Sequence, residues 1–415
     1  MMTRWKVALL GACSCAVVLA SCGGGDGGAG GGSGSVVTPT LARLNDTGVT
    51  ADQCFAAGSF ATFAAGNFFP GRSAFASCSS PEARALSTRQ DGQVGRDAVA
   101  ATNASSDGKL GFQFSAVPGG CVRDEVTGLT WESKTTDVGL HDHRDRYSNL
   151  GDGSHGDASE FVSAVNLAGL CGAADWRLPT LQELHSLLDY GAMAAKPHVG
   201  EGGVYIDTNW FPNLDGDYGA YWTSTLTTPV SPVNSRGRYV SFVAPSDGVN
   251  FSRGDRHEHY AVRLVRGGDA WVAAETRFTP SADAQEVTDR QTGLVWRRCL
   301  EGTHYVAGSC PGTISAGGPE AALRLAETVA ASTGVGWRLP NAKELLGLTQ
   351  PGRDIPPYDP VAFPATPTQQ RAAWSSTPCS PNLAASSAFD TQGASAEVSC
   401  NALGGTGVLL VRDPS

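Results

Sequence analysis

The sequence predicts an α+β protein with two tandem copies of one domain, each with two helices packed on a loop-rich antiparallel sheet. Three observations support this prediction. Short blocks of sequence recur in the same order in both halves of the chain. Helix-start motifs precede short β-rich runs in each half, and loops rich in Gly, Pro and Asn separate those runs. This order of elements differs from the regular strand–helix alternation of a Rossmann fold.

The start of the chain has the pattern of a bacterial lipoprotein signal. Arg4 and Lys6 precede an apolar stretch that is too short to span a bilayer, and Ala20 and Ser21 lead directly to Cys22. We therefore expect residues 1–21 to be removed and Cys22 to carry the lipid that anchors the protein to a membrane. An ordinary signal peptide with an incidental cysteine is the alternative. Residues 22–38 are mostly Gly and Ser and predict a flexible tether.

The residue that follows Cys22 indicates where the protein is located, and the net charge of the chain indicates which partners are excluded. Because Gly23 and not Asp follows the lipidated cysteine, the usual sorting rule predicts an outer-membrane lipoprotein that faces the periplasm or the cell surface. The chain has 30 Lys and Arg against 40 Asp and Glu, a formal net charge of −10. This balance argues against a nucleic-acid partner, since phosphate binding needs clustered cations. Nothing in the sequence sets the oligomeric state.

Eight cysteines remain once the signal and the lipidated residue are set aside. An even number without a C-x-x-C motif favours structural disulfides over a redox or copper pair. Eight cysteines allow 105 connectivities. Chain order favours four local pairs: Cys54–Cys78, Cys121–Cys171, Cys299–Cys310 and Cys379–Cys400. Each pair would lie inside one domain, so we expect domains that fold independently.

The internal repeat fixes the domain boundaries. DEVTGLTW at 124–131 recurs as DRQTGLVW at 289–296, and WRLPTLQEL at 176–184 recurs as WRLPNAKEL at 337–345. Asp207 with FP at 211–212, WTST at 222–225 and VR at 265–266 recur as Asp359 with FP at 363–364, WSST at 374–377 and VR at 411–412. We therefore predict a first copy at 116–270 and a second at 278–415. Residues 39–115 would be a disulfide-stapled extension packed on the first copy.

Each repeated block has a local structural interpretation. The Thr-Gly step predicts a turn followed by a half-buried strand. Thr180 with Glu183 predicts a capping box, and Asn341 with Glu344 repeats it. Apolar residues from Leu181 to Leu188 would line one face of the helix that follows.

Further elements lie on either side of that helix. A preceding helix is expected to start at Asp157 with support from Glu160, and Pro319 opens its counterpart in the second half. Residues 221–223, 239–242 and 262–265 are expected to be strands.

Tryptophan and arginine recur in the same blocks. Trp131, Trp176 and Trp222 lie within apolar runs in both copies, which favours core packing over sugar stacking. Arg177 and its counterpart Arg338 are expected to hold a carboxylate in a structural pair. Asp207 and Asp359 are the predicted partners.

Taken together, the repeated blocks resemble the Lcl C-terminal domain family, long catalogued as a domain of unknown function. The resemblance covers both copies and implies a C-type-lectin-like fold related to that of the formylglycine-generating enzyme. It also implies a surface role, since a member of the family is an adhesin that binds sulfated glycosaminoglycans. The second copy departs from the pattern, with Leu409 where the first has Arg263. The resemblance therefore predicts the fold twice and not two equivalent sites.

Enzyme and metal features are weak. His141, Asp142 and His143 with Asp145 and His155, and His257 with Glu258 and His259, form two clusters in polar, Gly-rich stretches. A solvated loop is the default for such clusters, and neither has the spacing of a helical zinc motif. Asp91 and Asp97 allow calcium, but turn chemistry is the favoured explanation for them. We predict no catalytic residues, no metal site and no cofactor.

A ligand site is expected on the loops at 191–219 and 227–259 of the first copy, because loops on a rigid scaffold usually carry binding. The candidate residues are aromatic and cationic: Trp210, Tyr218, Arg236, Arg238, Arg253 and Arg256. The leading interpretation is a non-enzymatic lipoprotein that presents lectin-like domains for adhesion or for binding a glycan or protein. One alternative is an enzyme of the formylglycine-generating or metal-hydrolase type. The other is a structural envelope protein whose second copy only buries the first.

Overall fold

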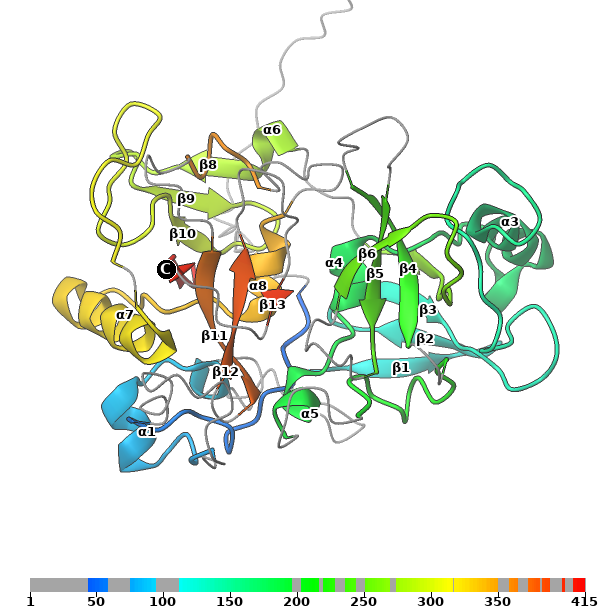
Figure 1. The fold of residues 1–415 in the computed structure, drawn as a ribbon, viewed down its shortest axis with the longest axis horizontal. Helices are drawn as coiled ribbons and strands as arrows, with labels where there is room; N and C mark the ends of the chain where they lie inside the picture. The colour runs from blue at the N-terminus through cyan, green and yellow to red at the C-terminus, as the bar shows by residue number, and fades with distance from the viewer. Residues whose placement is uncertain are drawn as a thin grey trace, which may run out of the picture. The chain divides into compact units, whose positions relative to one another are not determined.

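The computed structural model describes residues 44–58, 75–94, 112–195, 203–215, 219–227, 236–243, 251–268, 274–315, 317–349, 358–364, 372–380, 383–388, 398–399 and 406–414 (Figure 1). The chain divides into Met1–Thr38 and a compact unit, Pro39–Ser415, that holds both copies. The predicted signal, the tether and Cys22 lie outside the described residues, as do Asp97, Tyr218 and Cys400. In the part of the chain that the structure describes, no helix combines the length and apolarity needed to cross a membrane.

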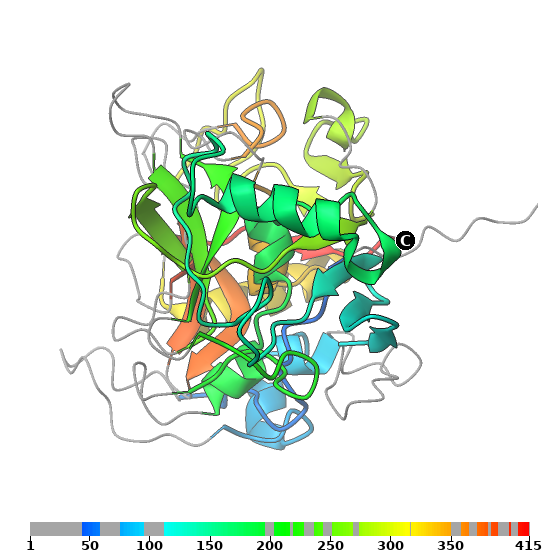
Figure 2. The ribbon, with the colours of Figure 1, turned by 90° about the vertical axis from the view of Figure 1, so that its right-hand side faces the viewer.

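Two antiparallel sheets build the first copy. One has the order β1-β2-β3-β7 and consists of β1 (Phe114–Val117), β2 (Cys121–Asp124), β3 (Leu129–Glu132) and β7 (Val265–Gly267). The other consists of β4 (Ala220–Leu226), β5 (Arg236–Ser241) and β6 (Phe251–Asp255). The helices are α3 (Ala158–Ala168), α4 (Leu181–His185) and α5 (Tyr190–Ala194), with a 3₁₀ turn at Leu170–Gly172. Helix α3 crosses the face turned toward the viewer in Figure 2.

The second copy repeats the first sheet strand for strand. Its order is β8-β9-β10-β15, formed by β8 (Phe278–Pro280), β9 (Glu286–Asp289), β10 (Val295–Arg297) and β15 (Val411–Arg412). The other sheet holds β11 (Ala372–Ser380), β12 (Leu383–Ala388), β13 (Val398–Ser399) and β14 (Thr406–Gly407), and the helices are α6 (Ala274–Arg277), α7 (Pro319–Thr333) and α8 (Ala342–Gly347). The closing strands share one register, with Trp131 opposite Val265 and Trp296 opposite Val411. The predicted α+β repeat is confirmed.

The predicted turns and helix starts are present. Gly128 and Gly293 adopt φ of 72° and 76°, a left-handed conformation that glycine takes without strain. Both capping boxes are complete, with Thr180 and Asn341 as the N-caps of α4 and α8. Asp157 caps α3, although its Glu160 accepts from the backbone of the residue before the cap rather than from the cap itself.

The strand predicted at 262–265 is shorter than expected, because only Val265 lies in β7. The backbone N–H of Leu264 donates to the Glu132 carboxylate at 2.9 Å instead of to a neighbouring strand. The Arg263 guanidinium in turn donates to the Glu132 carbonyl oxygen at 2.8 Å. The Glu132 N–H still donates to the Leu264 carbonyl oxygen at 3.0 Å, so a buried side-chain network supplements a shortened backbone ladder here.

The two copies share one apolar core. Its largest cluster contains first-copy residues such as Trp131 and Leu184, together with Ala342 and Leu346 of α8 and the disulfide-bonded Cys379. Each of these residues is almost fully buried. Separating the copies would expose this surface to water at roughly 25 cal/mol per Å² of apolar area. The structure therefore does not support the expectation of independently folding domains.

The extension contacts both copies, whereas the sequence placed it on the first alone. It contains α1 (Pro81–Leu86) and α2 (Asp91–Val94). Phe55 and Leu86 pack in a core cluster with the α7 side of the second copy, while Val49 belongs to the shared core. The Glu327 carboxylate of α7 accepts from the backbone and hydroxyl of Thr88. The extension thus holds the copies to each other.

Three of the four predicted disulfides are confirmed. The structure contains Cys54–Cys78 in the extension, Cys121–Cys171 in the first copy and Cys299–Cys310 in the second. Cys379 is also disulfide-bonded. Its predicted pairing with Cys400 stays a prediction, because Cys400 lies outside the described residues.

Candidate functional site

The repeated arginine and the capping box form one local unit in each copy. Arg177 donates to both oxygens of the Glu183 carboxylate at 2.7 and 2.8 Å, and the same carboxylate accepts the N–H of Thr180 at 2.7 Å. Arg338 and Glu344 repeat this arrangement, with both distances at 2.8 Å. One glutamate therefore closes the helix start and neutralises the arginine.

The partners predicted for these arginines are wrong. Asp207 accepts from the backbone N–H of Asn209, and Asp359 accepts from the N–H groups of Val361 and Ala362. Both aspartates hold turns after their own helices. The nearby glutamate is the better partner because the helix start already fixes it beside the guanidinium.

Helices α4 and α8 meet between the copies. Gln182 and Lys343 occupy the same position in the repeated block, and each reaches across to the other copy. The Gln182 amide donates to the carbonyl and hydroxyl oxygens of Thr349 at 3.1 and 2.5 Å. The Lys343 ammonium donates to the carbonyl oxygen of Ser186 at 2.8 Å. This reciprocal contact is typical of two similar units related by an approximate two-fold axis.

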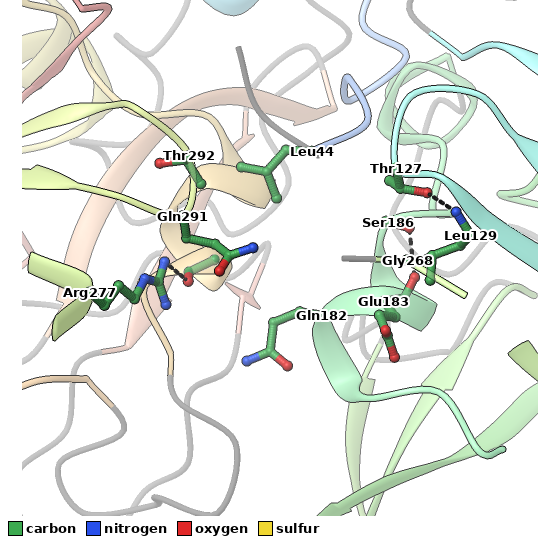
Figure 3. A pocket seen from close by; sticks show the side chains of 11 residues that line it. Leu44, Thr127, Leu129, Gln182, Glu183, Ser186, Gly268, Arg277, Gln291 and Thr292 are labelled. Carbon is green, nitrogen blue, oxygen red and sulfur yellow. Dashed lines mark hydrogen bonds between the residues drawn. The ribbon is translucent and has the colours of Figure 1, made fainter. Parts of the chain in front are cut away.

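A small crevice, partly open to solvent, lies at this junction. Figure 3 shows second-copy residues on one side, first-copy residues on the other, and Leu44 of the extension between them. The described residues that line it are Leu44, Thr127, Leu129, Gln182, Glu183, Ser186, Gly268, Arg277, Gln291, Thr292 and Gly347. Thr127 and Thr292 are equivalent in the repeat, as are Ser186 and Gly347. The crevice is therefore built from corresponding surfaces of the two copies.

Both charged side chains in the described lining of the crevice already have partners. Glu183 is paired with Arg177, and Arg277 donates to both carboxylate oxygens of Asp289 at 2.8 and 2.7 Å and to the carbonyl oxygen of Gly347 at 2.7 Å. By contrast, the side-chain oxygen of Gln182 is buried and accepts no hydrogen bond from any described residue. An unsatisfied buried acceptor costs free energy, and because almost none of this oxygen is exposed, it is not presented to a ligand in the crevice.

A buried polar cluster surrounds Lys343, where the extension and both copies meet. Lys343 also donates to the Asp46 carbonyl oxygen and lies 4.4 Å from the centre of the Phe112 ring. Burial lowers its pKa to about 7, although the charges of Asp46, Asp189 and other nearby carboxylates oppose that shift. Burial, followed by the charge of Asp46, raises the pKa of Asp91 to about 7. The ionisation of this junction therefore changes near neutral pH.

The first copy has a second buried cluster that the second copy lacks. Glu132 accepts from Lys134 and lies 2.8 Å from the His141 ring nitrogen. Burial alone would raise the pKa of Glu132, but the charge of Lys134 and these hydrogen bonds hold it below its ordinary value. Arg263 stacks over the rings of Phe211 and Tyr221. The second copy has Arg297, Cys299 and Leu409 at the positions of Glu132, Lys134 and Arg263.

The two predicted histidine clusters do not converge on a common centre. His143 contacts the Thr135 carbonyl oxygen, His155 contacts Glu160 and His257 contacts Asp255. Within the described ranges, no three His, Cys, Asp or Glu residues form a group suited to a metal ion. Asp91, considered for calcium, accepts from the hydroxyls of Thr47 and Thr377.

The structure disperses the residues predicted to bind a ligand. Arg236, Arg238 and Arg253 lie together on β5 and β6, with Arg238 opposite Arg253. Arg256 instead donates to carbonyl oxygens of Asn149 and Leu150. Trp210 packs against Phe114 and the core. Their role in binding stays a prediction.

The repeated tryptophans are buried, as the sequence predicted. Sequence reasoning missed the crevice residues Gln182, Gln291 and Arg277. A signal was present, because Gln182 and Lys343 are polar residues that recur at one position beside buried leucines.

The fold and the paired cap helices define a tandem α+β repeat protein in which one domain occurs twice. The model of the Lcl C-terminal domain matches residues 120–266 and 285–412, together more than half of the chain, so the chain belongs to this family. The comparison with curated proteins and the comparison with solved structures each gave no match.

Proposed function

We propose that this chain is a non-enzymatic envelope lipoprotein, anchored through Cys22, whose two Lcl domains bind a glycan or protein in the crevice between them. The observation that carries the proposal is the crevice itself, which corresponding surfaces of the two copies form at their junction. Ligand sites occur preferentially in concave surfaces where two domains meet. The Gln182 side chain, whose nitrogen donates to Thr349, links the two copies there.

The remaining lining supports binding more than catalysis. The carboxylate of Glu183 and the guanidinium of Arg277 are both held in bidentate ion pairs, so neither is poised to transfer a proton or stabilise a charged intermediate. Thr292 donates its hydroxyl proton to Asp289 at 2.9 Å. Among the described lining residues, Leu44 and Leu129 add apolar surface.

The proposed location follows from the start of the sequence. The basic residues, the short apolar stretch and the small residues before Cys22 favour lipidation, and the Gly/Ser segment would let the binding unit move about the anchor. Labelling cells with a radioactive or clickable fatty acid tests this part. Wild-type protein should incorporate the label and the Cys22→Ala variant should not. Equal labelling of both would contradict the proposal.

The binding proposal can be tested with the unlipidated mature chain, residues 23–415. Its binding to glycan and matrix-protein arrays is measured beside two tryptophan variants. Gln291→Trp should fill the crevice and remove binding, because Gln291 lines it and is half-buried. Gln113→Trp is the matched control, since Gln113 is exposed and does not line the crevice. Blank arrays with folded protein would refute the proposal, and so would binding that Gln291→Trp leaves unchanged.

A structural role is the second candidate, and the shared core favours it. Ala342, Leu346 and Cys379 of the second copy complete the largest apolar cluster of the first. A purely structural role predicts that Gln291→Trp alters stability alone, with no ligand to lose. The array experiment therefore separates the two candidates.

A further inference from the structure

We propose that binding of the extension to the two copies is linked to proton uptake, so that the extension is held more tightly in mild acid than at neutral pH. The extension here means the described residues 44–58 and 75–94. The proposal concerns local opening of this segment and does not depend on what the crevice binds. It rests on two buried ionisable groups at the junction, Asp91 and Lys343, whose hydrogen-bonding partners are neutral.

The Asp91 carboxylate joins the extension to the second copy through hydroxyl groups. Asp91 is 2% exposed, and one of its carboxylate oxygens accepts from the hydroxyls of Thr47 and Thr377 at 2.9 and 2.6 Å. The Thr377 hydroxyl oxygen also accepts the N–H of Ala342 at 2.9 Å, so the contact continues to the start of α8. No described cation forms an ion pair with Asp91. Protonation of its other carboxylate oxygen would remove an uncompensated buried charge and leave both hydroxyl contacts intact.

The Lys343 ammonium joins the extension to the first copy in a similar way. It is 3% exposed and donates to the carbonyl oxygens of Asp46 and Ser186, and it lies over the ring of Phe112. None of these partners carries a charge at the contacting atoms, and no described carboxylate forms an ion pair with Lys343. Two ionisable groups of opposite sign are therefore buried at one junction without a counter-ion in contact, which makes the charged form of each costly.

Other titratable groups face this pair from each element around it. Repulsion by Asp46 adds to burial in raising the pKa of Asp91, and the carboxylate of Glu344 adds a smaller repulsion. Burial also raises the pKa of Asp124, which accepts from Asn45 of the extension at 2.6 Å, so its effect has the same sign as that of Asp91. The remaining groups lie in the first copy and are His185, Asp189 and Tyr190.

His185 would act in the opposite direction, because burial lowers its pKa well below 6.5. Its ring nitrogen lies 2.9 Å from the hydroxyl oxygen of Tyr190, which belongs to the same copy. The partner of His185 therefore stays in place when the extension opens, and its titration contributes to global unfolding more than to this local step.

The direction of the pH effect follows from proton linkage. Asp91 keeps its proton up to about pH 7 in the closed form, whereas an exposed aspartate loses it near pH 3.8. Closing therefore takes up a proton between these values, and the closed form becomes less stable as pH rises through them. Burial lowers the pKa of Lys343 from 10.5 to about 7, so closing releases a proton above pH 7 and the closed form regains stability there. The extension should be held least tightly near neutral pH.

Hydrogen exchange of the mature chain, residues 23–415, followed by mass spectrometry tests this inference. Peptides from 75–94 report the opening of the extension, and peptides that cover β9 and β10 report the second copy itself. The opening constant is the ratio of open to closed forms, obtained after correction for the intrinsic exchange rate. For 75–94 it should rise at least about tenfold in wild type between pH 5 and pH 7.5, and it should rise less for β9 and β10.

Two variants assign the effect to Asp91. Asp91→Asn retains an acceptor for both threonine hydroxyls but does not titrate, so its opening constant for 75–94 should change by less than about twofold over the same range. Asp52→Asn is the matched control, because Asp52 is exposed in the same extension, and it should keep the wild-type dependence. Carbon-13 NMR of wild type labelled at its aspartate carboxyl groups should show one carboxyl that titrates near pH 7 and is missing from Asp91→Asn.

Three results would overturn the inference. Equal pH dependence of 75–94 in wild type and Asp91→Asn would show that another group controls the opening. Exchange of 75–94 that follows β9 and β10 at both pH values would show that the extension opens only when the whole unit unfolds. A wild-type spectrum in which every aspartate carboxyl titrates below pH 5 would exclude a proton held by Asp91, and this result decides the matter even if Asp91→Asn does not fold.

Discussion

The two copies share their local motifs but differ in how deeply those motifs are buried. The Arg–Glu pair at the helix start has the same geometry in each. The Arg177 side chain is 43% exposed, however, whereas that of Arg338 is 8% exposed and also contacts Asp413. Glu132 and its cationic partners occur in the first copy only. The repeat thus fixes turns, caps and buried indoles, while the charged groups depend on what each copy packs against.

This difference concentrates the unusual chemistry at the junction of the copies. Gln182 and Lys343 are equivalent in the repeat, yet one lines a crevice and the other is buried among carboxylates. A duplicated domain has acquired a new surface where its copies meet. The following experiments test how much the shared core and the groups at this junction contribute to the stability of the protein.

Removal of residues 280–415 should have the largest effect. The first copy would lose Ala342, Leu346 and Cys379 from its core and expose the apolar surface that they cover. We expect the remaining fragment to lose its cooperative thermal transition, as measured by near-ultraviolet circular dichroism. A fragment that melts as sharply as the complete mature chain, and at the same temperature, would show that the first copy needs no partner.

The same change of glutamate to glutamine should reduce the unfolding free energy more in the second copy than in the first. Among the described residues, Glu344→Gln leaves the buried Arg338 with the exposed Asp413 as its remaining anionic partner, and the variant should lose about 3 kcal/mol of unfolding free energy. Glu183→Gln leaves the half-exposed Arg177 near water, at a cost of about 1 kcal/mol. Urea unfolding of the two variants measures the difference. Equal losses of unfolding free energy in the two variants would mean that the different burial of Arg177 and Arg338 does not affect stability.

The pH dependence of the junction should depend on Asp91. Its pKa of about 7 in the folded protein lies above the ordinary value of 3.8. The folded state therefore binds more protons between these values, and the Asp91 contribution falls as pH rises from about 4 to 7. Asp91→Asn retains an acceptor for Thr47 and Thr377 without ionising.

Melting temperatures at pH 5 and pH 7.5 measure this effect. Between pH 5 and pH 7.5, the melting temperature of the wild type should fall by roughly 5 °C more than that of Asp91→Asn. Identical pH profiles for the two proteins would contradict the assignment of a raised pKa to Asp91.

Loss of either N-cap should have the smallest effect and the same effect in both copies. Thr180→Ala and Asn341→Ala each remove a side chain that accepts from the third residue of its helix, at 3.2 and 2.8 Å. Each should cost about 1 kcal/mol in urea unfolding. A clear difference between the two variants would indicate that the caps, too, depend on their surroundings.

Local signals in the sequence predicted much of the fold. The capping boxes, the Thr-Gly turns and the buried indoles need only a few neighbouring residues, and three disulfides follow from chain order. Errors arose where distant segments meet. The partner of Arg177 was sought at Asp207 although Glu183 lay closer, and the extension was placed on one copy because its contacts with α7 leave no local pattern. The crevice at Gln182 is formed by two copies, so neither copy's sequence describes it.

Scanning calorimetry of the mature chain, residues 23–415, tests the central claim most directly. If the extension and the two copies form a single unit with a shared core, they should unfold in one transition whose calorimetric and van't Hoff enthalpies agree. Two separable transitions, one assigned to each copy by its response to Glu183→Gln and Glu344→Gln, would contradict that claim and leave the crevice without a stable frame.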